Sequence, residues 1–458
     1  MTCAAVLAGT GSAFALAAAP ASGVTNLYAP QAAATGPGVL GQFAVASNGS
    51  LAALAPETLP DSPVDIAVTP DGRFGYVTLG TRGGIAELDL VPGTGGRMQR
   101  AGAVSGFTPN GILVNPQGTR VFYANTVGDA VGSRPIDPTT GNLGAETAVS
   151  TGTTTKPQFL AMTPSGTSLY VGVARDGTGS ILQYDVNPAT GALTPKTQAF
   201  VDWPGPIGPA AGLQVTPSTI ARMTVTPDGA HLYAASGQLD TGLAHFSIDA
   251  SGTLVAGSVV GLPADGAATS VAPVSPSGLL LWAPTSAVRQ AAGRIDRFSI
   301  GATGGLTPLL PSPPYVVDAA TRDAVAAPAG TTLYLGQDAN VGDWVIGANA
   351  ALTPRADMPV TGTRNAGLAL SPSQAPVASF TAAPQPAGQA TSFNAAASVD
   401  PDGTIATYDW DFGDGTALPN GGPAPSHVYA TAGARNVMLT VTDADGTSTA
   451  KMALWPSM

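Results

Sequence analysis

An internal repeat constrains the fold of this chain more than any other feature. Six stretches combine an apolar run, a proline, a short turn and an aromatic residue six positions after the proline, as in "LAMTPSGTSLYV". Only 6% of the residues are aromatic, so chance does not explain this pattern. The prolines are Pro70, Pro116, Pro164, Pro227, Pro276 and Pro328. The aromatic partners are Tyr76, Phe122, Tyr170, Tyr233, Trp282 and Tyr334.

A second signature follows each copy, as in "IDPTTGNL" and "VNPATGAL". Its polar, small and glycine residues are typical of a hairpin turn between a third and a fourth strand. With Pro372 of an incomplete seventh copy included, successive prolines are mostly 44 to 52 residues apart, which is the length of a four-stranded propeller blade. One blade cannot bury both of its faces, so we expect the aromatic residues to fill the layers between stacked blades. The fold class is therefore all-β.

The seventh copy is incomplete, because "RNAGLALSPS" supplies only one strand. The missing part lies at the other end of the chain. "GVTNLYAPQ" (23–31) carries Tyr28 in the aromatic position, and "LGQFAVASNGSL" (40–51) resembles the third strand and its turn. We therefore predict a closed seven-bladed ring in which one C-terminal strand lies beside three N-terminal strands. Ser373, Gln374 and Ala375 would form the linker to the next domain.

The N-terminal segment is rich in small apolar residues and ends in Ala19-Pro20-Ala21. That pattern is typical of a secretory signal peptide over residues 1–21, although the segment has no Lys or Arg, and a disordered alanine-rich leader is the alternative. The only cysteine, Cys3, lies in this segment, so the exported chain would form no disulfide. No later run of about 18 apolar residues predicts a transmembrane segment.

The charge balance argues against nucleic acid as a partner. The formal net charge is −11, and the 18 basic residues are scattered singly. Binding to a phosphate backbone needs clustered Lys and Arg that release counterions. The acidic balance instead keeps a surface of low charge density soluble.

The repeated "TPDG…LYV" followed by "D…TG.L" resembles the YVTN-repeat, lactonase-like seven-bladed β-propellers over residues 22–373. In such a fold the first strand of each blade lines a central channel, and ligands meet the loops at one mouth of it. The polar residues that begin these strands are our binding candidates. They are Asp65, Asn110, Gln158, Arg222, Arg322, Asp323, Arg364 and Asn365. Such a ring could hold a polar or sugar-like ligand, or it could only hydrate the channel and satisfy strand ends.

The resemblance also raises the hypothesis of lactone hydrolysis, which needs a polarised carbonyl and a base that activates water. Members of this family tend to place a histidine near the start of a channel strand, where this chain has Gln158 and Phe159. His231 and His245 fall in outer strands instead, so Asp65 and Asp323 would be the residues to test as bases. The sequence contains no metal-ligand spacing, nucleophile elbow or phosphate-binding loop, and it predicts no cofactor.

One spacing of 63 residues, between Pro164 and Pro227, contains a proline-rich insertion at 200–219. Long loops on a rigid scaffold often carry binding residues, so Trp203 could cap a pocket. A passive surface loop is the favoured interpretation.

From Pro376 the sequence changes character. "YDWDFGDGT", with "SVDPDGTI" before it and "HVYATAG" after it, resembles a PKD domain, an immunoglobulin-like β-sandwich, over residues 376–454. Alternation puts Val437, Leu439 and Val441 on one face of a strand. Asp400 and Asp402 could donate carboxylates to Ca²⁺, but aspartate is an ordinary turn residue and turn chemistry is favoured.

Two functional hypotheses follow. The first is a secreted or cell-surface binding module for extracellular protein or cell-wall polysaccharide, which is the role that the PKD resemblance implies. The alternative is a secreted lactonase-like hydrolase that uses the propeller channel. The missing channel histidine favours the first. We expect a monomer.

Overall fold

The computed structural model describes residues 24–455, apart from short gaps. The gaps are 33–36, 47, 81–82, 92–94, 103–108, 176–177, 205–219, 221, 237–241, 262–265, 269, 274–279, 288–292, 310–314, 318–320, 328–329, 339, 348–350, 361–363, 366, 373–375, 401–403 and 444–447. The described residues form strands and turns without any α-helix, which confirms the all-β prediction. Consequently, no described helix has the length and hydrophobicity needed to cross a bilayer. The predicted signal peptide at 1–21 and the linker at 373–375 lie outside the described residues.

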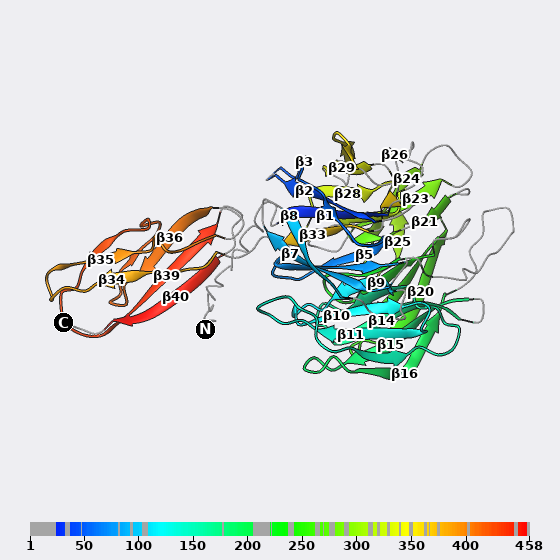
Figure 1. Cartoon of the computed structure of the whole chain (residues 1–458), viewed down its shortest axis with the longest axis horizontal. Coiled ribbons are helices and arrows are strands. Elements are labelled where there is room, and N and C mark those ends of the chain that lie inside the picture. The colour runs from blue at the N-terminus through cyan, green and yellow to red at the C-terminus, as the bar shows by residue number, and fades with distance from the viewer. Residues whose placement is uncertain are drawn as a thin grey trace, which may run out of the picture.

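The first four blades are four-stranded antiparallel sheets, each built from consecutive strands (Figure 1). Blade 1 contains β5 (Pro63–Val68), β6 (Phe74–Leu79), β7 (Ile85–Val91) and β8 (Gly95–Gly102). Blade 2 contains β9 (Pro109–Val114), β10 (Arg120–Asn125), β11 (Ala130–Pro135) and β12 (Thr147–Ser150). Blade 3 contains β13 (Phe159–Met162), β14 (Ser168–Arg175), β15 (Thr178–Val186) and β16 (Leu193–Asp202). Blade 4 contains β17 (Arg222–Val225), β18 (His231–Ala235), β19 (Gly242–Ile248) and β20 (Leu254–Gly261).

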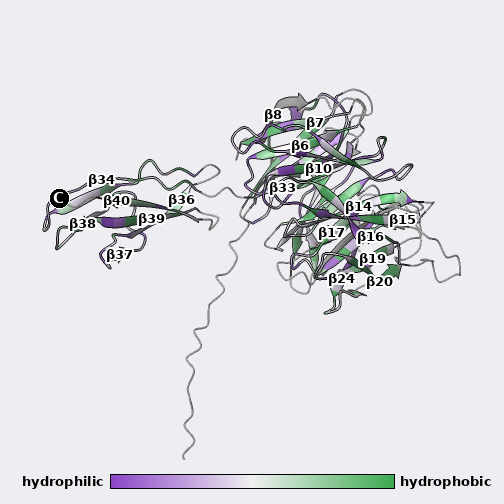
Figure 2. Ribbon diagram, turned by 90° about the horizontal axis from the view of Figure 1, so that it is seen from below, coloured by the Kyte–Doolittle hydropathy of each residue, from purple (hydrophilic) through white to green (hydrophobic). Residues whose placement is uncertain are grey.

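Blades 5 and 6 keep this order, but their edge strands are split into short pieces. Blade 5 contains β21 (Gly266–Ala268), β22 (Ala272–Pro273), β23 (Leu280–Ala287), β24 (Gly293–Ile300), β25 (Leu306–Pro308) and β26 (Tyr315–Val317). Blade 6 contains β27 (Asp323–Ala326), β28 (Thr332–Gly336), β29 (Asn340–Ile346), β30 (Leu352–Pro354) and β31 (Met358–Pro359). Figure 2 shows mainly apolar residues on strands such as β15 and β19, which are inner strands of their sheets.

The seventh blade closes the ring in the predicted way. It combines β1 (Val24–Ala32), β2 (Val39–Val45), β3 (Leu51–Ala53) and β4 (Glu57–Thr58) with β32 (Arg364–Asn365) and β33 (Ala369–Pro372). β33 pairs antiparallel with β1, which places Tyr28 opposite Ala369. Tyr28 is fully buried, and it packs with Ile66 and Val77 of blade 1. The N-terminal and C-terminal strands of the propeller are thus joined by hydrogen bonds within one sheet.

The contact between two neighbouring blades, which we call a seam, joins the two repeated sequence signatures. In four of the six copies the residue six positions after the proline is a tyrosine, and it donates a hydrogen bond to the carbonyl of a turn glycine in the next blade. The pairs are Tyr76–Gly141 (2.8 Å), Tyr170–Gly252 (2.7 Å), Tyr233–Gly304 (2.7 Å) and Tyr334–Gly49 (2.7 Å). These four tyrosines are fully buried, which confirms the interpretation that the aromatic residues fill the layers between blades. The turn glycines have positive φ, so other residues would strain the same turns.

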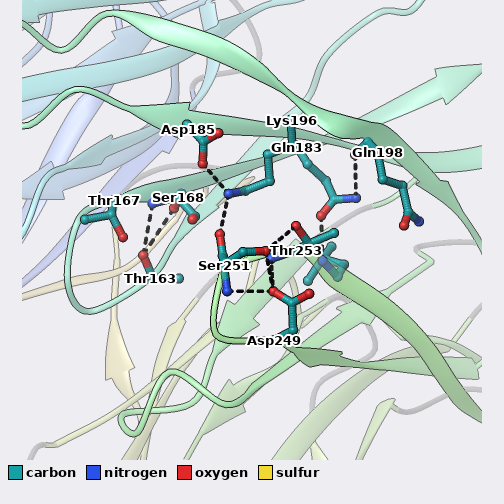
Figure 3. Close-up of polar contacts among 12 residues, drawn as sticks. Thr163, Thr167, Ser168, Gln183, Asp185, Lys196, Gln198, Asp249, Ser251 and Thr253 are labelled. Atoms are coloured by element: carbon teal, nitrogen blue, oxygen red, sulfur yellow. Dashed lines mark hydrogen bonds and ion pairs between the residues drawn. The ribbon is translucent and has the colours of Figure 1, made fainter.

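A buried polar side chain in the third strand completes several seams. It lies opposite the aromatic residue in the register, as Gln183 lies opposite Tyr170. Gln183 Oε1 accepts a hydrogen bond of 2.6 Å from the backbone N–H of Leu254 in blade 4. In the same seam Lys196, whose side chain is only 3% exposed, pairs with Asp185 and donates to the carbonyl of Ser251 at 2.8 Å (Figure 3). These seams therefore contain specific polar bonds within an apolar layer.

We expect Tyr170→Phe to lower the free energy of unfolding by about 1 kcal/mol, because it removes one buried hydrogen bond and leaves the Gly252 carbonyl without its partner. Tyr184→Phe is the control. The Tyr184 side chain is also buried, but its hydroxyl makes no hydrogen bond among the described residues. Denaturant unfolding of both variants measures the difference, and equal losses would contradict this role of the tyrosine.

The C-terminal domain is a sandwich of two antiparallel sheets, as predicted. One sheet contains β34 (Thr381–Ala383), β35 (Ala390–Asn394) and β38 (Ser426–Val428). The other contains β36 (Ile405–Asp411), β37 (Ala417–Leu418), β39 (Arg435–Asp443) and β40 (Ser448–Trp455). Val437, Leu439 and Val441 are fully buried against Trp410, which confirms the predicted face.

Chain connectivity fixes where this domain leaves the propeller. The innermost strand of every blade starts at one end of the channel, which we call the mouth, and runs to the opposite face. β33 ends at that opposite face, where Ser371 Oγ donates to the carbonyl of Gly72 at 3.2 Å. Only three residues separate Pro372 from Pro376. The sandwich is therefore attached at the face opposite to the mouth (Figure 1).

Candidate functional site

Three of the predicted binding residues meet at the mouth. Asp65 lies near the start of β5, Arg222 is the first residue of β17, and Asp323 is the first residue of β27. They come from blades 1, 4 and 6, which are not neighbours in the ring. Since each innermost strand begins at the mouth, the side chains at their first positions converge on the channel axis. We call these three residues the axial cluster.

Arg222 bridges the two carboxylates of the axial cluster. Its guanidinium makes a two-pronged contact with Asp65, with Nη1 3.1 Å from Oδ2 and Nη2 3.0 Å from Oδ1. Nη2 also lies 3.2 Å from Oδ2 of Asp323. Such bidentate pairing is the strongest geometry for an arginine–carboxylate contact. The side chains of Asp65, Asp323 and Arg222 are 5%, 11% and 18% exposed, so the ion pairs are largely shielded from water.

Blades 2, 5 and 7 supply the other hydrogen bonds of the two carboxylates. Asp65 accepts a hydrogen bond of 3.1 Å from the backbone N–H of Ile112 in blade 2. Asp323 accepts one of 2.7 Å from the Ser270 hydroxyl and one of 3.0 Å from the backbone N–H of Leu368 in blade 7. Both carboxylates are therefore held by fixed donors as well as by the arginine.

Two further contacts fix the guanidinium itself. The Cζ atom of Arg222 lies 4.4 Å from the centre of the Phe159 ring of blade 3, in a cation–π geometry. At Gly367 a Cβ atom would lie 2.5 Å from Oδ1 of Asp65 and 3.3 Å from Nη2 of Arg222. Only glycine allows the backbone of blade 7 to approach the cluster this closely.

Burial and charge act in opposite directions on these groups. Burial raises the pKa of Asp65 above its ordinary value, and the Arg222 guanidinium opposes that rise. Burial lowers the pKa of Arg222, but the carboxylates of Asp323 and Asp65 outweigh this effect, so the pKa lies above its ordinary value. The arginine therefore stays charged, and the cluster carries more negative than positive charge when both carboxylates are ionised.

The other predicted site residues do not join the cluster. Asn110 Nδ2 lies 3.4 Å from the Thr126 hydroxyl, and its carbonyl accepts from Thr78. The Gln158 carbonyl accepts a hydrogen bond of 2.6 Å from the N–H of Gly111, which joins blades 2 and 3. Arg322 forms a half-exposed ion pair with Asp338, with Nε 2.8 Å from Oδ1. For Arg364 and Asn365 the structure describes only the backbone, which pairs with β1.

The arrangement leaves little for base catalysis. Asp65 and Asp323, the two residues considered as bases, both accept ion-pair and hydrogen-bond donors in the cluster. His231 and His245 lie at the other end of blade 4. Arg222 pairs with Ala235 at the end of β18, whereas His231 is the first residue of β18. The two ends of β18 are four residues and roughly 13 Å apart. Across the described part of the chain, no group of three metal-ligating side chains is brought together.

Comparison with known proteins assigns the C-terminal domain. Residues 373–454 match the family described as PKD domain. The C-terminal sandwich is a PKD domain. The PKD domain accounts for one of the two modules that the sequence predicted.

The propeller is similar in fold to solved lactonase-like structures. A protein from Lactobacillus plantarum matches with a TM-score of 0.61 and 16% identity, over 76% of this chain and 99% of that chain. A putative 6-phosphogluconolactonase from Bacteroides fragilis gives 0.61 and 16%, over 76% and 98%. The periplasmic gluconolactonase PpgL from Pseudomonas aeruginosa gives 0.61 and 15%, over 75% and 99%. At these identities the likeness establishes the fold alone.

Three aspartates of the PKD domain accept hydrogen bonds from nearby turns and loops. Asp409 accepts from the N–H of Asn420, and Asp411 accepts from the N–H of Gly413. Asp414 accepts from Thr416 and forms an ion pair of 2.8 Å with His427. Asp411 and Asp414 thus have the local bonds of turn residues, whereas Asp409 bonds to a loop 11 residues further along the chain. Asp402, one of the two residues considered for Ca²⁺, lies outside the described residues.

Trp203 has a different role from the one considered for it. Its side chain is 5% exposed and packs with Ile220 and Met223 in the core between blades 3 and 4. Trp203 is therefore a core residue and does not cap a pocket. The proline-rich part of the insertion, 205–219, lies outside the described residues.

Sequence reasoning missed the partners of the axial cluster. Ser270 and Gly367 carry no motif, and Ile112 and Leu368 contribute only backbone N–H groups. Phe159 directly follows Gln158, a predicted site residue. This position beside a channel-facing polar residue was the one available sign that Phe159 contacts the cluster. The buried polar residues of the seams could have been found by looking for polar side chains at a fixed position in each third strand.

Proposed function

We propose that this protein is a secreted or cell-surface binding protein. The propeller mouth contacts the ligand, and the PKD domain is a second interaction module on the opposite face. The observation that carries this proposal is the axial cluster, in which both candidate bases are engaged by Arg222. A cluster of fixed ion pairs is a rigid polar surface, which is better suited to ligand recognition than to proton transfer.

The PKD domain supports the extracellular location, because such domains are typical of extracellular proteins. Its attachment opposite to the mouth leaves the mouth loops accessible while the PKD domain contacts a surface. The partly buried side chains of Asn110 and Gln158 lie at the mouth without belonging to the cluster. Amide groups of this kind bind the hydroxyl and carbonyl groups of polysaccharide or of an extracellular protein.

We expect the purified protein to bind cell-wall polysaccharide saturably and to leave gluconolactone and related lactones unhydrolysed. The combined variant Asn110→Ala and Gln158→Ala should weaken binding at least about tenfold, since it removes two amides at the mouth without disturbing the ion pairs. Thr139→Ala, in an exposed turn at the opposite face, is the control and should bind normally. Calorimetry and a lactone assay measure the two properties.

The competing function is lactone hydrolysis, which the fold of the gluconolactonase from Pseudomonas aeruginosa suggests. Turnover of any lactone above the uncatalysed rate would overturn the binding-only proposal. Saturable binding that the two mouth substitutions leave unchanged would move the binding site away from the mouth.

A further inference from the structure

The seam between blades 4 and 5 differs chemically from the other seams. Two polar positions lie beside each seam tyrosine, one two residues before it in the same strand and one opposite it in the next strand. They hold Ser168 and Gln183 in blade 3, and Thr332 and Asp343 in blade 6. At blade 4 the same positions hold His231 and His245, on either side of Tyr233. Two of the three histidines in the chain therefore occupy one seam.

The two imidazoles are in direct contact. Nδ1 of His231 lies 3.0 Å from Nε2 of His245, and the ring centres are 5.1 Å apart. The His245 ring stacks on Tyr233 with ring centres 5.2 Å apart, and only 4% of His245 is exposed. In this geometry one ring donates an N–H and the other accepts it, so the contact requires at least one neutral imidazole.

The next blade packs directly on this pair. A Cβ atom at Gly304 would lie 2.1 Å from Nε2 of His245 and 2.4 Å from Nδ1 of His231, so the turn of blade 5 covers both nitrogens. Gly304 also accepts the Tyr233 hydroxyl bond that joins the two blades. The turn residues 301–305 have no titratable side chain. On blade 4, the titratable groups beside the pair are Tyr233, whose ring contacts both imidazoles, and the Asp228 carboxylate, which interacts electrostatically with His231.

We propose that the seam between blades 4 and 5 is an acid-sensitive joint, which is held closed by the hydrogen bond between the two histidines and opens when both rings carry a proton. Two imidazolium rings have no acceptor for the shared hydrogen bond, and their like charges lie in a contact that Gly304 shields from water. The seam between blades 3 and 4 uses serine and glutamine at these positions, so it has no corresponding response.

The electrostatics of the buried His245 ring also favour opening of the seam at low pH. Burial, with a smaller effect of His231, lowers the pKa of His245 to about 4 from its ordinary 6.5. The closed seam therefore binds a proton more weakly than the open seam. The stabilisation is fully present above about pH 6.5 and is lost as the pH falls towards 4. At about pH 5 this shift corresponds to a roughly 30-fold larger opening constant.

Hydrogen exchange on the full chain tests the joint. We expect amides of β18 and β19 to lose roughly 30-fold in protection between about pH 7.5 and about pH 5, after correction for intrinsic exchange rates. Amides of β14 and β15, in the blade 3 seam, should keep their protection. Equal protection of β18 and β19 at both pH values would overturn the proposal, and so would an equal loss in β14 and β15.

The matched variant copies the neighbouring seam into this one. His231→Ser with His245→Gln reproduces the pair at Ser168 and Gln183, and it should make the protection of β18 and β19 independent of pH over this range. If the double variant does not fold, His245→Gln alone carries the test, because it removes the buried ring. A variant that folds and still loses roughly 30-fold in protection at about pH 5 would show that the histidines are not the cause.

Discussion

Arg222→Leu is expected to lower the free energy of unfolding of the propeller by about 3 to 5 kcal/mol, because it leaves two buried carboxylates without their cation. The loss exceeds that of an ordinary surface ion pair, because Asp65 and Asp323 have side chains only 5% and 11% exposed. The effect should depend on pH. Without Arg222, burial raises the pKa of Asp65 unopposed by a cation, so this carboxyl takes up a proton above its ordinary titration range. The difference from the wild type should therefore already shrink as the pH falls from neutral into the mildly acidic range. Denaturant unfolding at neutral and acidic pH measures both quantities.

Arg322→Leu is the matched control, since it also removes an arginine from an ion pair at the mouth. The side chains of Arg322 and Asp338 are 38% and 37% exposed, so we expect a change of about 1 kcal/mol or less. A second check is rescue, in which Asp65→Asn should recover part of the stability lost in Arg222→Leu. Similar losses for Arg222→Leu and Arg322→Leu would show that the axial cluster is no more than a surface contact.

Removing residues 22–32 is expected to abolish the cooperative unfolding of the propeller. The deletion takes away β1, which lies between β2 and β33 and carries the fully buried Leu27, Tyr28 and Ala29. Without it, blade 7 loses its internal pairing, and both blade 1 and blade 6 lose a packing partner. A propeller distributes its stability over contacts between neighbouring blades, so an open ring loses contacts on both sides of the gap.

Calorimetric melting distinguishes ring opening from a local effect. The deletion should replace one sharp transition with a broad one at lower temperature. Removal of residues 1–21 is the control and should leave the melting profile of the propeller unchanged, because β1 begins only at Val24. A deletion of 22–32 that melts like the wild type would contradict the role of β1 in closure.

The blade architecture was predictable because its signals are local and repeated. The aromatic residue six positions after each proline and the glycine turn that follows define a four-stranded unit. The structure confirms these units, and it adds that the two signatures bind each other across the seam, as Tyr170 binds Gly252. The closure by Tyr28 was also predictable, because the incomplete seventh copy needed a strand that the N-terminus supplies.

The candidate site was predictable only as a set of positions. The polar residues at the starts of innermost strands included Asp65, Arg222 and Asp323, but nothing in the sequence separated these three from Asn110 or Gln158. The suggestion that Trp203 caps a pocket was wrong, because a tryptophan beside a proline-rich insertion gives no sign of the core between blades 3 and 4 that it enters.

The sequence by itself determined the number of blades, the strand that closes the ring and the PKD domain, because each depends on patterns within a few tens of residues. Only the tertiary structure decided which polar residues meet. Arg222 is 157 residues from Asp65 and 101 from Asp323, and their contact exists only because the closed ring brings three separate blades to one axis. The histidine pair has a similar origin. His231 and His245 are close in the chain, but their burial depends on Gly304 of the next blade. Contacts of this kind depend on ring geometry, which no local periodicity encodes.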